Sequence, residues 1–559
     1  MDRSLFVTGA AGEGIQTIGD VVARCFLRHG YPVFVSQEFE SRIRGGHSSV
    51  RIRVADSPRN APRADADVLL ALNPSAEAHY ADAVCADGLT ISPQSLTAEA
   101  NHLGVPFVPL ATTHGGREVY ANAVAAGSLC AAVGLPFAVL EAVLGETFEK
   151  RGDAVVRANV DSARAGFDEA ADQLANEKTE IPPRRDMTYA FASAHGTIPL
   201  AAAAAGCRFI AAYPMSPSTG IITAFARHPE LGVFAEQAED EIAAINMTLG
   251  ASAAGARAMT ATSGGGFALM AEGLSLAGMI ETPIVIVVAQ RPGPATGLPT
   301  RTAQEDLLFA IRAGHGEFPR VVLAPSDPQD AIDLTIRAFD LADRHQVPAI
   351  LLTDQFLADS SFSLDRLELP VEIPADHLAD PTEMDTYARY APSDGGASPR
   401  LAFGQGGHTV VLDSDEHTPE GHITEDLKAV RPRAVEKRLE KLRRLRSEIR
   451  PPIADRTDDA ELILVGWGST KHAIAEAVDL LRADGRKVGS VHFAELWPLP
   501  KVGPPAAKDT WTVEGNATGQ LAQLLRGELG WPIDKTIGRW DGLPIDARFL
   551  VQHLTEKTP

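Results

Sequence analysis

The amino-acid sequence predicts a multidomain α/β protein, and three observations lead to this fold class. The chain of 559 residues is too long for one hydrophobic core and predicts roughly three to four domains of about 150 residues each. Hydrophobic residues make up 45% of the chain and charged residues 22%, which is the balance of an ordinary folded protein. Short apolar runs alternate with helical stretches rich in Ala and Leu, a pattern typical of parallel sheets covered by helices.

The first domain is expected over residues 1–176. It opens with an apolar run, a glycine-rich turn from Gly9 to Gly14, a helix through Arg28 and a second apolar run, which together indicate a βαβ start. Further strands are expected at residues 68–72 and 105–110, and helices at 122–133 and 137–149. A linker containing Pro182 and Pro183 then separates this domain from the next.

The second domain is expected over residues 186–360, with strands that alternate with helices of small residues. The apolar run that begins at Ile284 has the composition of a central parallel strand buried on both faces. The predicted strands are residues 209–212, 233–235, 258–261, 284–289, 321–324 and 349–353.

Two further segments complete the chain. Residues 361–458 lose periodicity and end in a charged helix at about 430–449, which is expected to be a linker that is more solvated than packed. Residues 459–559 are expected to form a compact C-terminal α/β domain. Its predicted elements are strands at 461–465, 488–493 and 510–514 and a helix at 471–484.

Composition excludes several classes of function. The net charge of −22 and the pI of about 5.2 argue against binding to nucleic acid or to an anionic membrane. The cysteines form no Cys-x-x-Cys pair, so neither an iron–sulfur cluster nor a metal site is expected in this chain. A cytoplasmic location is expected, because the sequence has neither a leader pattern nor an apolar run long enough to span a bilayer.

The loop Tyr213-Pro-Met-Ser-Pro-Ser-Thr219 directly follows a predicted strand. Strand ends of this kind are where open α/β sheets bind ligands. The prolines stiffen the turn, while hydroxyls and the N–H groups of a following helix form a cradle for a carboxylate. On local features alone an ordinary capped loop is the favoured interpretation.

An acidic cluster that includes Glu239, Asp240 and Glu241 begins the next apolar helix. Acidic residues in a first helical turn usually interact with the helix dipole. A buried glutamate with a raised pKa could instead hydrogen-bond a heterocyclic nitrogen. Glu241 is the favoured candidate because it adjoins the apolar run.

Two more loops follow predicted strands. In Thr260-Ala-Thr-Ser-Gly-Gly-Gly-Phe267 the glycines allow backbone to approach a ligand closely, although a glycine-rich loop alone is weak evidence. The proline-rich loop from Gln290 to Arg301 brings Arg291 and Thr300 to the end of the buried strand. Arg291 offers a fork of donors for a carboxylate, or it has only a structural role.

These four motifs, in this order, resemble the alpha (large) subunit of 2-oxoacid:ferredoxin oxidoreductases with a gamma domain fused at its N-terminus. The resemblance covers nearly the whole chain. The family motif Tyr-Pro-Ile-Thr-Pro reads Tyr-Pro-Met-Ser-Pro here, with Met215 for Ile and Ser216 for Thr, and Ala295 stands where Ser is frequent. The resemblance implies a gamma-type α/β domain, a doubly wound pyrimidine-binding domain for thiamine diphosphate, and a C-terminal transketolase-C-like α/β domain.

The resemblance also implies roles for single residues. Glu241 would be the catalytic residue that hydrogen-bonds the aminopyrimidine of thiamine diphosphate. The substrate would bind to Tyr213, Ser216, Arg291 and Thr300, and the cofactor also to Pro214, Ser263 and Gly264. Arg42 and Arg44 would meet coenzyme A.

A partner chain is implied as well. This sequence lacks the Gly-Asp-Gly and paired Asn pattern that binds magnesium and diphosphate. A beta subunit would therefore supply Mg²⁺, the diphosphate site and a [4Fe-4S] cluster, and would pass electrons to ferredoxin. The expected assembly is a dimer of heterodimers.

The expected substrate is 2-oxoglutarate, because the fused layout and the linker motifs at 413–417 and 421–426 resemble that branch of the family. Pyruvate or a broad range of 2-oxoacids is the alternative within the family. From other classes, a nicotinamide dehydrogenase is disfavoured because the glycine order is Gly-x-x-Gly-x-Gly and only Glu38 and Glu40 could bind ribose. A non-catalytic interaction protein is the remaining alternative.

Overall fold

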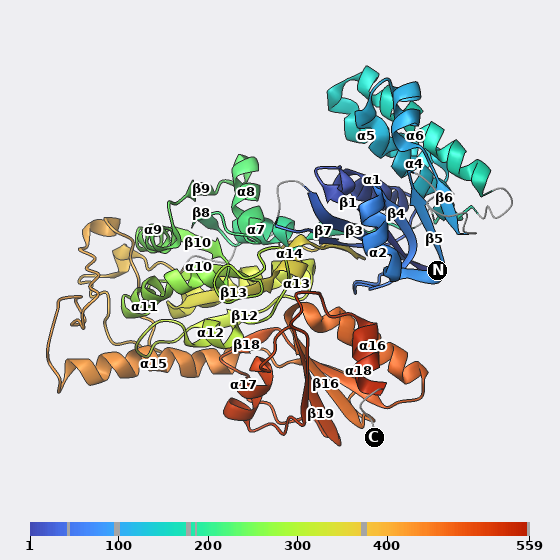
Figure 1. The fold of residues 1–559 in the computed structure, drawn as a ribbon. Helices are drawn as coiled ribbons and strands as arrows, with labels where there is room; N and C mark the ends of the chain where they lie inside the picture. The colour runs from blue at the N-terminus through green and yellow to red at the C-terminus, as the bar shows by residue number, and fades with distance from the viewer. Residues whose placement is uncertain (42–44, 94–100, 175–179, 185–186, 371–376, 556–559) are drawn as a thin grey trace. The chain divides into compact units, whose positions relative to one another are not determined.

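The computed structural model describes residues 1–41, 45–93, 101–174, 180–184, 187–370 and 377–555. The fold is multidomain α/β with three sheets, which confirms the predicted fold class (Figure 1). The chain divides into two compact units. Unit 1 comprises Met1–Ala192, Ser360–Leu367 and Asp546–Arg548, and unit 2 comprises Ser193–Asp359, Glu368–Ile545 and the residues from Phe549 onward.

Unit 1 contains an eight-stranded mixed sheet of order β6-β5-β4-β1-β3-β2-β14-β7. Its strands are β1 (Asp2–Ala11), β2 (Val33–Glu38), β3 (Gly45–Ala55), β4 (Ala66–Ala71), β5 (Val84–Ser92), β6 (His102–Gly104), β7 (Ala190–Ser193) and β14 (Ser361–Leu364). The sequence did not reveal β3, which lies between β1 and β2 and runs antiparallel to both. The predicted βαβ start is therefore interrupted by an inserted strand.

The helices of unit 1 match the predictions at 122–133 and 137–149, but one predicted strand is wrong. Residues 105–110 were expected to be a strand, whereas Phe107–Leu110 forms the short helix α3 after Pro106. Proline lacks an N–H for a strand ladder and fits readily at a helix start. The helices are α1 (Ile15–Arg28), α2 (Pro74–Tyr80), α3, α4 (Ala121–Val133), α5 (Phe137–Phe148) and α6 (Asp153–Gln173).

Unit 2 is built around a seven-stranded sheet of order β18-β12-β13-β11-β10-β8-β9. All seven residues of β11 are buried, as expected for a central parallel strand. The strands, each close to a predicted range except β18, are β8 (Cys207–Ala212), β9 (Phe234–Gln237), β10 (Arg257–Thr262), β11 (Ile284–Gln290), β12 (Val321–Leu323), β13 (Pro348–Asp354) and β18 (Glu495–Trp497).

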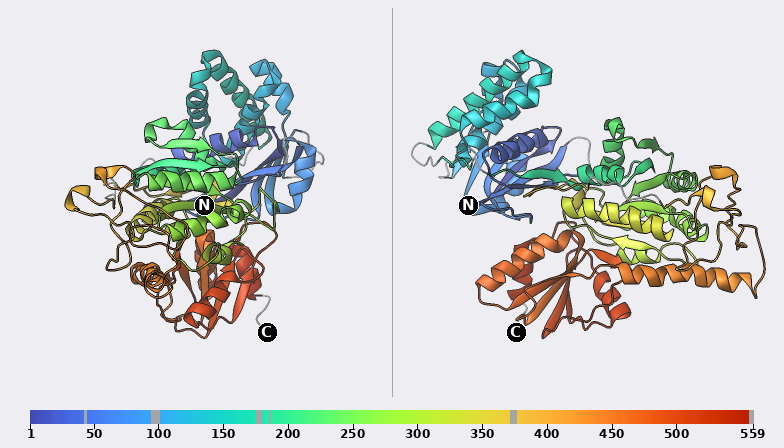
Figure 2. Two further views of the ribbon diagram at one scale, coloured as in Figure 1. Left: turned by 90° about the vertical axis from the view of Figure 1, so that its left-hand side faces the viewer. Right: turned by 180° about the vertical axis from the view of Figure 1, so that it is seen from behind.

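Helices cover both faces of this sheet, as Figure 2 shows from two further sides. They are α7 (Ala194–Ala204), α8 (Thr219–Arg227), α9 (Glu241–Ala253), α10 (Gly264–Leu269), α11 (Ala271–Met279), α12 (Leu307–Arg312), α13 (Pro328–His345) and α14 (Gln355–Asp359). The capping residue of α13 is Asp327, whose carboxylate accepts hydrogen bonds from the N–H groups of Gln329 and Asp330.

The C-terminal part of unit 2 has its own five-stranded sheet of order β15-β17-β16-β19-β20. Its elements are β15 (Ile453–Asp455), β16 (Leu462–Trp467), α16 (Lys471–Ala483), β17 (Val488–Phe493), β19 (Asp509–Glu514), α17 (Gln520–Leu529), β20 (Lys535–Gly538) and α18 (Ala547–Thr555). One apolar core includes Ile286 and Val288 of the larger sheet together with Ile463 and Trp467 of the smaller one. The two sheets of unit 2 therefore pack as one body.

Helix α15 (Val430–Glu448) has the predicted bounds but not the predicted surroundings. The sequence suggested a solvated helix, whereas Lys441 is 1% exposed and its ammonium group donates to the carboxylate of Glu281. Lys437 donates to the same carboxylate at 2.7 and 2.8 Å. One face of this charged helix is thus buried through ion pairs as well as through the apolar side chain of Leu445, which is 0% exposed.

No helix in the described part of the chain is both long enough and apolar enough to cross a bilayer.

Candidate active site

Three of the loops singled out in the sequence leave the same edge of the seven-stranded sheet. Strands β8, β10 and β11 are parallel neighbours, with Met259 of β10 opposite Ile210 and Val285. Their carboxyl ends therefore lie side by side, and each continues into a candidate loop. The first is residues 213–219, whose last residue begins α8, the second is Ser263 with the first turn of α10 at 264–266, and the third is the loop 291–306.

Glu241 lies beside these loops at the first turn of α9. Its neighbour Asp240 begins the helix, because the Asp240 carboxylate accepts a hydrogen bond of 2.8 Å from the N–H of Ala243. The Glu241 side chain is 2% exposed, and its Oε1 atom is buried without a hydrogen-bond partner among the described residues. Burial raises the pKa of the Glu241 carboxyl, and the charge of Asp240 adds to the increase.

The carboxyl group of Glu241 packs against Gly266 in α10. A Cβ atom at Gly266 would lie 2.5 Å from Glu241 Oε1 and 2.1 Å from the Thr262 hydroxyl oxygen. A side chain at position 266 would therefore displace Glu241. The sequence predicts that the three glycines allow a ligand to approach closely, and it gives no signal for this contact between Gly266 and Glu241.

Hydrogen bonds connect the three segments that follow β8, β10 and β11. Arg291 Nη1 donates a hydrogen bond of 2.7 Å to the Ser216 carbonyl, and Ser263 Oγ donates to Met215 Sδ at 2.7 Å. Arg291 forms no ion pair with a carboxylate within the described ranges, and partial burial lowers its pKa. The guanidinium thus retains donors for an anionic ligand.

The other predicted residues of this edge differ in their exposure. The side chains of Tyr213 and Ser216 are exposed, and Pro214 and Thr300 are half-buried. Ser216 contributes its carbonyl to the Arg291 contact, whereas the sequence analysis expected its hydroxyl to act. Thr300 is in the same loop as Arg291, and the structure gives it no hydrogen bond to the other candidate residues just named.

The far end of the 291–306 loop holds an acidic pair that the sequence analysis missed. Glu305 Oε2 accepts a hydrogen bond of 2.8 Å from the N–H of Gly293, which joins the two ends of the loop. Asp306 lies against Gly264, with Oδ2 2.3 Å from where a Cβ atom at Gly264 would be. Burial and the charge of Glu305 raise the pKa of Asp306 to about 6. Their positions after a long proline-rich loop were the only sequence signal.

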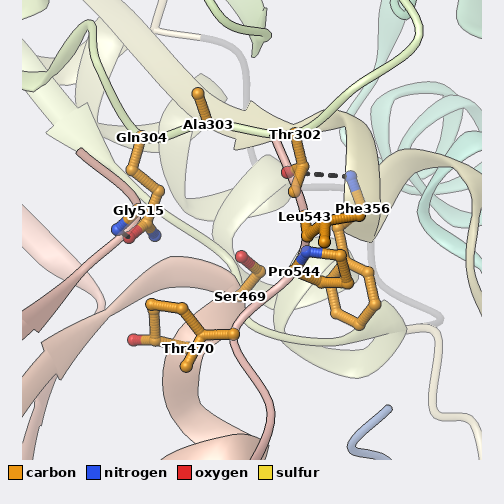
Figure 3. A pocket seen from close by; sticks show the side chains of 10 residues that line it. Thr302, Ala303, Gln304, Phe356, Ser469, Thr470, Gly515, Leu543 and Pro544 are labelled. Carbon is orange, nitrogen blue, oxygen red and sulfur yellow. Dashed lines mark hydrogen bonds between the residues drawn. The ribbon is translucent and has the colours of Figure 1, made fainter. Parts of the chain in front are cut away.

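The end of this loop lines the small cavity drawn in Figure 3. It is lined by residues that include Thr302, Gln304, Phe356, Ser469 and Gly515. Its volume of about 20 Å³ suits a single water molecule and is too small for a substrate. It marks the junction between the loop and the C-terminal sheet.

The glycine-rich loop at the end of β1 does not present a free phosphate cradle. The Glu13 carboxylate accepts hydrogen bonds of 2.7 Å from the N–H of Ala10 and from the side-chain amide of Asn73. A carboxylate of the chain itself thus uses the donor that a nucleotide phosphate would need. This contact counts against the dehydrogenase alternative. The predicted coenzyme A residues, Arg42 and Arg44, lie outside the described residues.

Comparison with known families defines the class of protein. Residues 200–437 match the family described as "Pyruvate flavodoxin/ferredoxin oxidoreductase, thiamine diP-bdg". Residues 4–169 match "Pyruvate ferredoxin/flavodoxin oxidoreductase". The matched regions correspond to the large-sheet part of unit 2 and to unit 1, so this is an α/β enzyme chain with a thiamine-diphosphate-binding domain.

Relatives that match nearly the whole chain identify the family within this class. The chain is 30% identical to 2-oxoacid:ferredoxin oxidoreductase 2, subunit alpha, of Aeropyrum pernix, over 98% of this chain and 96% of the relative. It is 30% identical to 2-oxoglutarate oxidoreductase subunit KorA of Mycobacterium tuberculosis, over 93% and 86%. The solved 2-oxoglutarate:ferredoxin oxidoreductase from Magnetococcus marinus, with 2-oxoglutarate, coenzyme A and succinyl-CoA bound, superposes with a TM-score of 0.90 at 30% identity over 99% of both chains. The chain belongs to the 2-oxoacid:ferredoxin oxidoreductase family, as an alpha subunit.

Proposed function

We propose that this chain, with a partner chain, oxidatively decarboxylates 2-oxoglutarate. One 2-oxoglutarate, one coenzyme A and two oxidised ferredoxins give succinyl-CoA, carbon dioxide, a proton and two reduced ferredoxins, and the same complex can run the reverse carboxylation. The choice of substrate is supported by the relative from Magnetococcus marinus, which covers 99% of the chain and binds 2-oxoglutarate. The relative from Aeropyrum pernix is named only for 2-oxoacids, so pyruvate or a broad range is the second candidate.

The unpaired carboxyl oxygen of Glu241 carries the proposal. The buried Oε1 atom has no partner in the part of the chain that the structure describes, so it is free to form a hydrogen bond with a ring nitrogen of thiamine diphosphate. The raised pKa favours the protonated carboxyl group, which can donate this hydrogen bond. Thiamine diphosphate, when bound, supplies the carbanion-stabilising chemistry that decarboxylation needs. Pro214, Ser263 and Gly264 contact this cofactor from the adjacent strand ends.

The substrate is held by the loops at residues 213–219 and 291–306. The free donors of Arg291 bind a carboxylate of the 2-oxoacid, and its bond to the Ser216 carbonyl fixes the orientation of the guanidinium. Tyr213, Ser216 and Thr300 complete the contacts to the carboxylate and the oxo group. Holding the substrate in one orientation aligns the bond that breaks.

A beta subunit completes the enzyme. It supplies Mg²⁺, the diphosphate site and a [4Fe-4S] cluster that passes electrons to ferredoxin, and the assembly is a dimer of heterodimers. Arg42 and Arg44 bind the phosphates of coenzyme A. These assignments rest on family membership and on the absence from this sequence of the motifs for the metal and the cluster.

The test is anaerobic reduction of a viologen dye by the chain co-expressed with the product of the neighbouring gene. Thiamine diphosphate and coenzyme A are supplied with either 2-oxoglutarate or pyruvate. We expect coenzyme-A-dependent reduction that is faster with 2-oxoglutarate, and loss of about a hundredfold or more of the rate in Glu241→Gln. Preference for pyruvate would overturn the substrate. No reduction with any 2-oxoacid, by a stable complex loaded with cluster and cofactor, would favour the non-catalytic alternative.

A further inference from the structure

Gln304, at the end of the 291–306 loop, is bound to the C-terminal sheet through both its backbone and its side chain. It is 2% exposed. Its N–H donates to the Gly515 carbonyl at 2.7 Å, and its carbonyl accepts from Asn516 Nδ2 at 2.9 Å. Its Nε2 donates to the Trp467 carbonyl at 3.0 Å, and its Oε1 accepts from the Gly515 N–H at 3.0 Å. Two of the four bonds are made by the side chain, and they require a donor and an acceptor together at the end of a side chain of this length.

The partners of Gln304 lie at the ends of two neighbouring parallel strands. Trp467 is the last residue of β16, and Gly515 and Asn516 directly follow β19. A Cβ atom at Gly468 would lie 3.1 Å from Gln304 Nε2, and one at Gly515 would lie 3.3 Å from Gln304 Cγ. This edge of a sheet is where α/β proteins commonly bind ligands. Here a glutamine of the substrate loop occupies it, as Figure 3 shows beside Gly515.

Gln520 makes a second connection between the same two parts. Its Oε1 accepts from the N–H of Leu308 at 2.9 Å, and its Nε2 donates to the carbonyl of Glu305. The Glu305 carboxylate in turn accepts from the N–H of Gly293, two residues after Arg291. A continuous series of hydrogen bonds thus runs from α17 to the start of the substrate loop.

We propose that Gln304 is a positioning residue for the 2-oxoacid, through which the C-terminal sheet sets the place of the 291–306 loop and hence of Arg291 and Thr300. The inference rests on the proposed function of that loop. Glu241 is held separately, by α9 and by its contact with Gly266. Loss of Gln304 should therefore weaken substrate binding while leaving binding of thiamine diphosphate unchanged.

The test compares Gln304→Ala with Gln346→Ala in the assembled complex. Gln346 is also buried, at 4% exposed, but it bonds to Ser398 and Arg389, away from the loop. We expect Gln304→Ala to raise KM for the 2-oxoacid about tenfold or more, with a smaller change in kcat and unchanged thiamine diphosphate content. Amide hydrogen exchange in residues 291–306 should quicken only in this variant.

Equal losses of thermal stability in both variants, with wild-type KM and wild-type exchange in the loop, would make Gln304 merely structural and overturn the inference. If Gln304→Ala does not fold, Gln520→Ala replaces it, because Gln520 is only half-buried and its removal frees Glu305 and Leu308 from α17. Wild-type complex that turns over no 2-oxoacid would instead refute the proposed function, and the exchange measurement would still report on the loop.

Discussion

Glu241 and Gly266 illustrate what single residues of this sequence reveal. The acidic cluster before an apolar helix was sufficient to select Glu241, because the first turn of such a helix is buried at its apolar side. The role of Gly266 could not be predicted, since its contact with Glu241 joins α9 to α10 across an intervening strand. A run of three glycines does not indicate which of them a distant side chain will approach.

The matched pair Gly266→Ala and Gly265→Ala tests this contact. In Gly266→Ala the new methyl group collides with Glu241 and Thr262, so we expect the apparent Kd for thiamine diphosphate to rise about tenfold or more. In Gly265→Ala the nearest atom is the Ala295 carbonyl oxygen at 3.5 Å, an ordinary contact, so affinity should stay near the wild-type value. Titration of the assembled complex with the cofactor measures both. Wild-type affinity in Gly266→Ala would contradict the assigned place of Glu241.

At the scale of elements, periodicity predicted the strands of the large sheet well because they are long buried apolar runs. It failed for β18, a three-residue strand that pairs antiparallel with β12 across a sequence separation of more than 170 residues. It also failed for the surroundings of α15, whose Arg and Lys residues indicate a solvated helix. Pairing with Glu281, far away in the sequence, is what makes burial of Lys441 possible.

Glu281→Gln tests how α15 is held. Although burial alone would raise the pKa of Glu281, the charges of Lys441, Lys437 and Arg389 lower it well below its ordinary value. Removing this carboxylate leaves buried cations without their counter-charge, so we expect a loss of about 3 kcal/mol in the free energy of unfolding. Denaturant unfolding measures it against Glu440→Gln, which breaks the exposed pair with Arg443 and should cost under about 1 kcal/mol. Similar small losses in both would refute the role of Glu281.

At the scale of the whole molecule, the two sheets of unit 2 share an apolar core, and a buried acid at the end of one sheet is hydrogen-bonded to the other part. Asp354 ends β13, is 2% exposed and accepts a hydrogen bond from Ser469, in the turn that follows the C-terminal strand β16. Burial raises its pKa to about 6, only partly offset by the hydrogen bonds from Ser469 and Leu357. Asp354 therefore ionises below neutral pH, but its burial makes ionisation less favourable than it is for an exposed aspartate.

The free energy of unfolding should therefore change with pH as Asp354 ionises. Because the pKa of Asp354 is raised from 3.8 to about 6 on folding, the folded state binds the extra proton between these values. Its stabilising contribution is present below pH 3.8 and is lost as the pH rises through about 6, a change of about 3 kcal/mol. The amide introduced by Asp354→Asn cannot ionise, so this variant should gain stability relative to wild type as the pH rises from 4 to 7. Thermal unfolding across this range measures the difference, with the 98% exposed Asp394 changed to Asn as control. Parallel curves for wild type and Asp354→Asn would mean that Asp354 titrates alike in the folded and unfolded chain, and would contradict a pKa raised by burial.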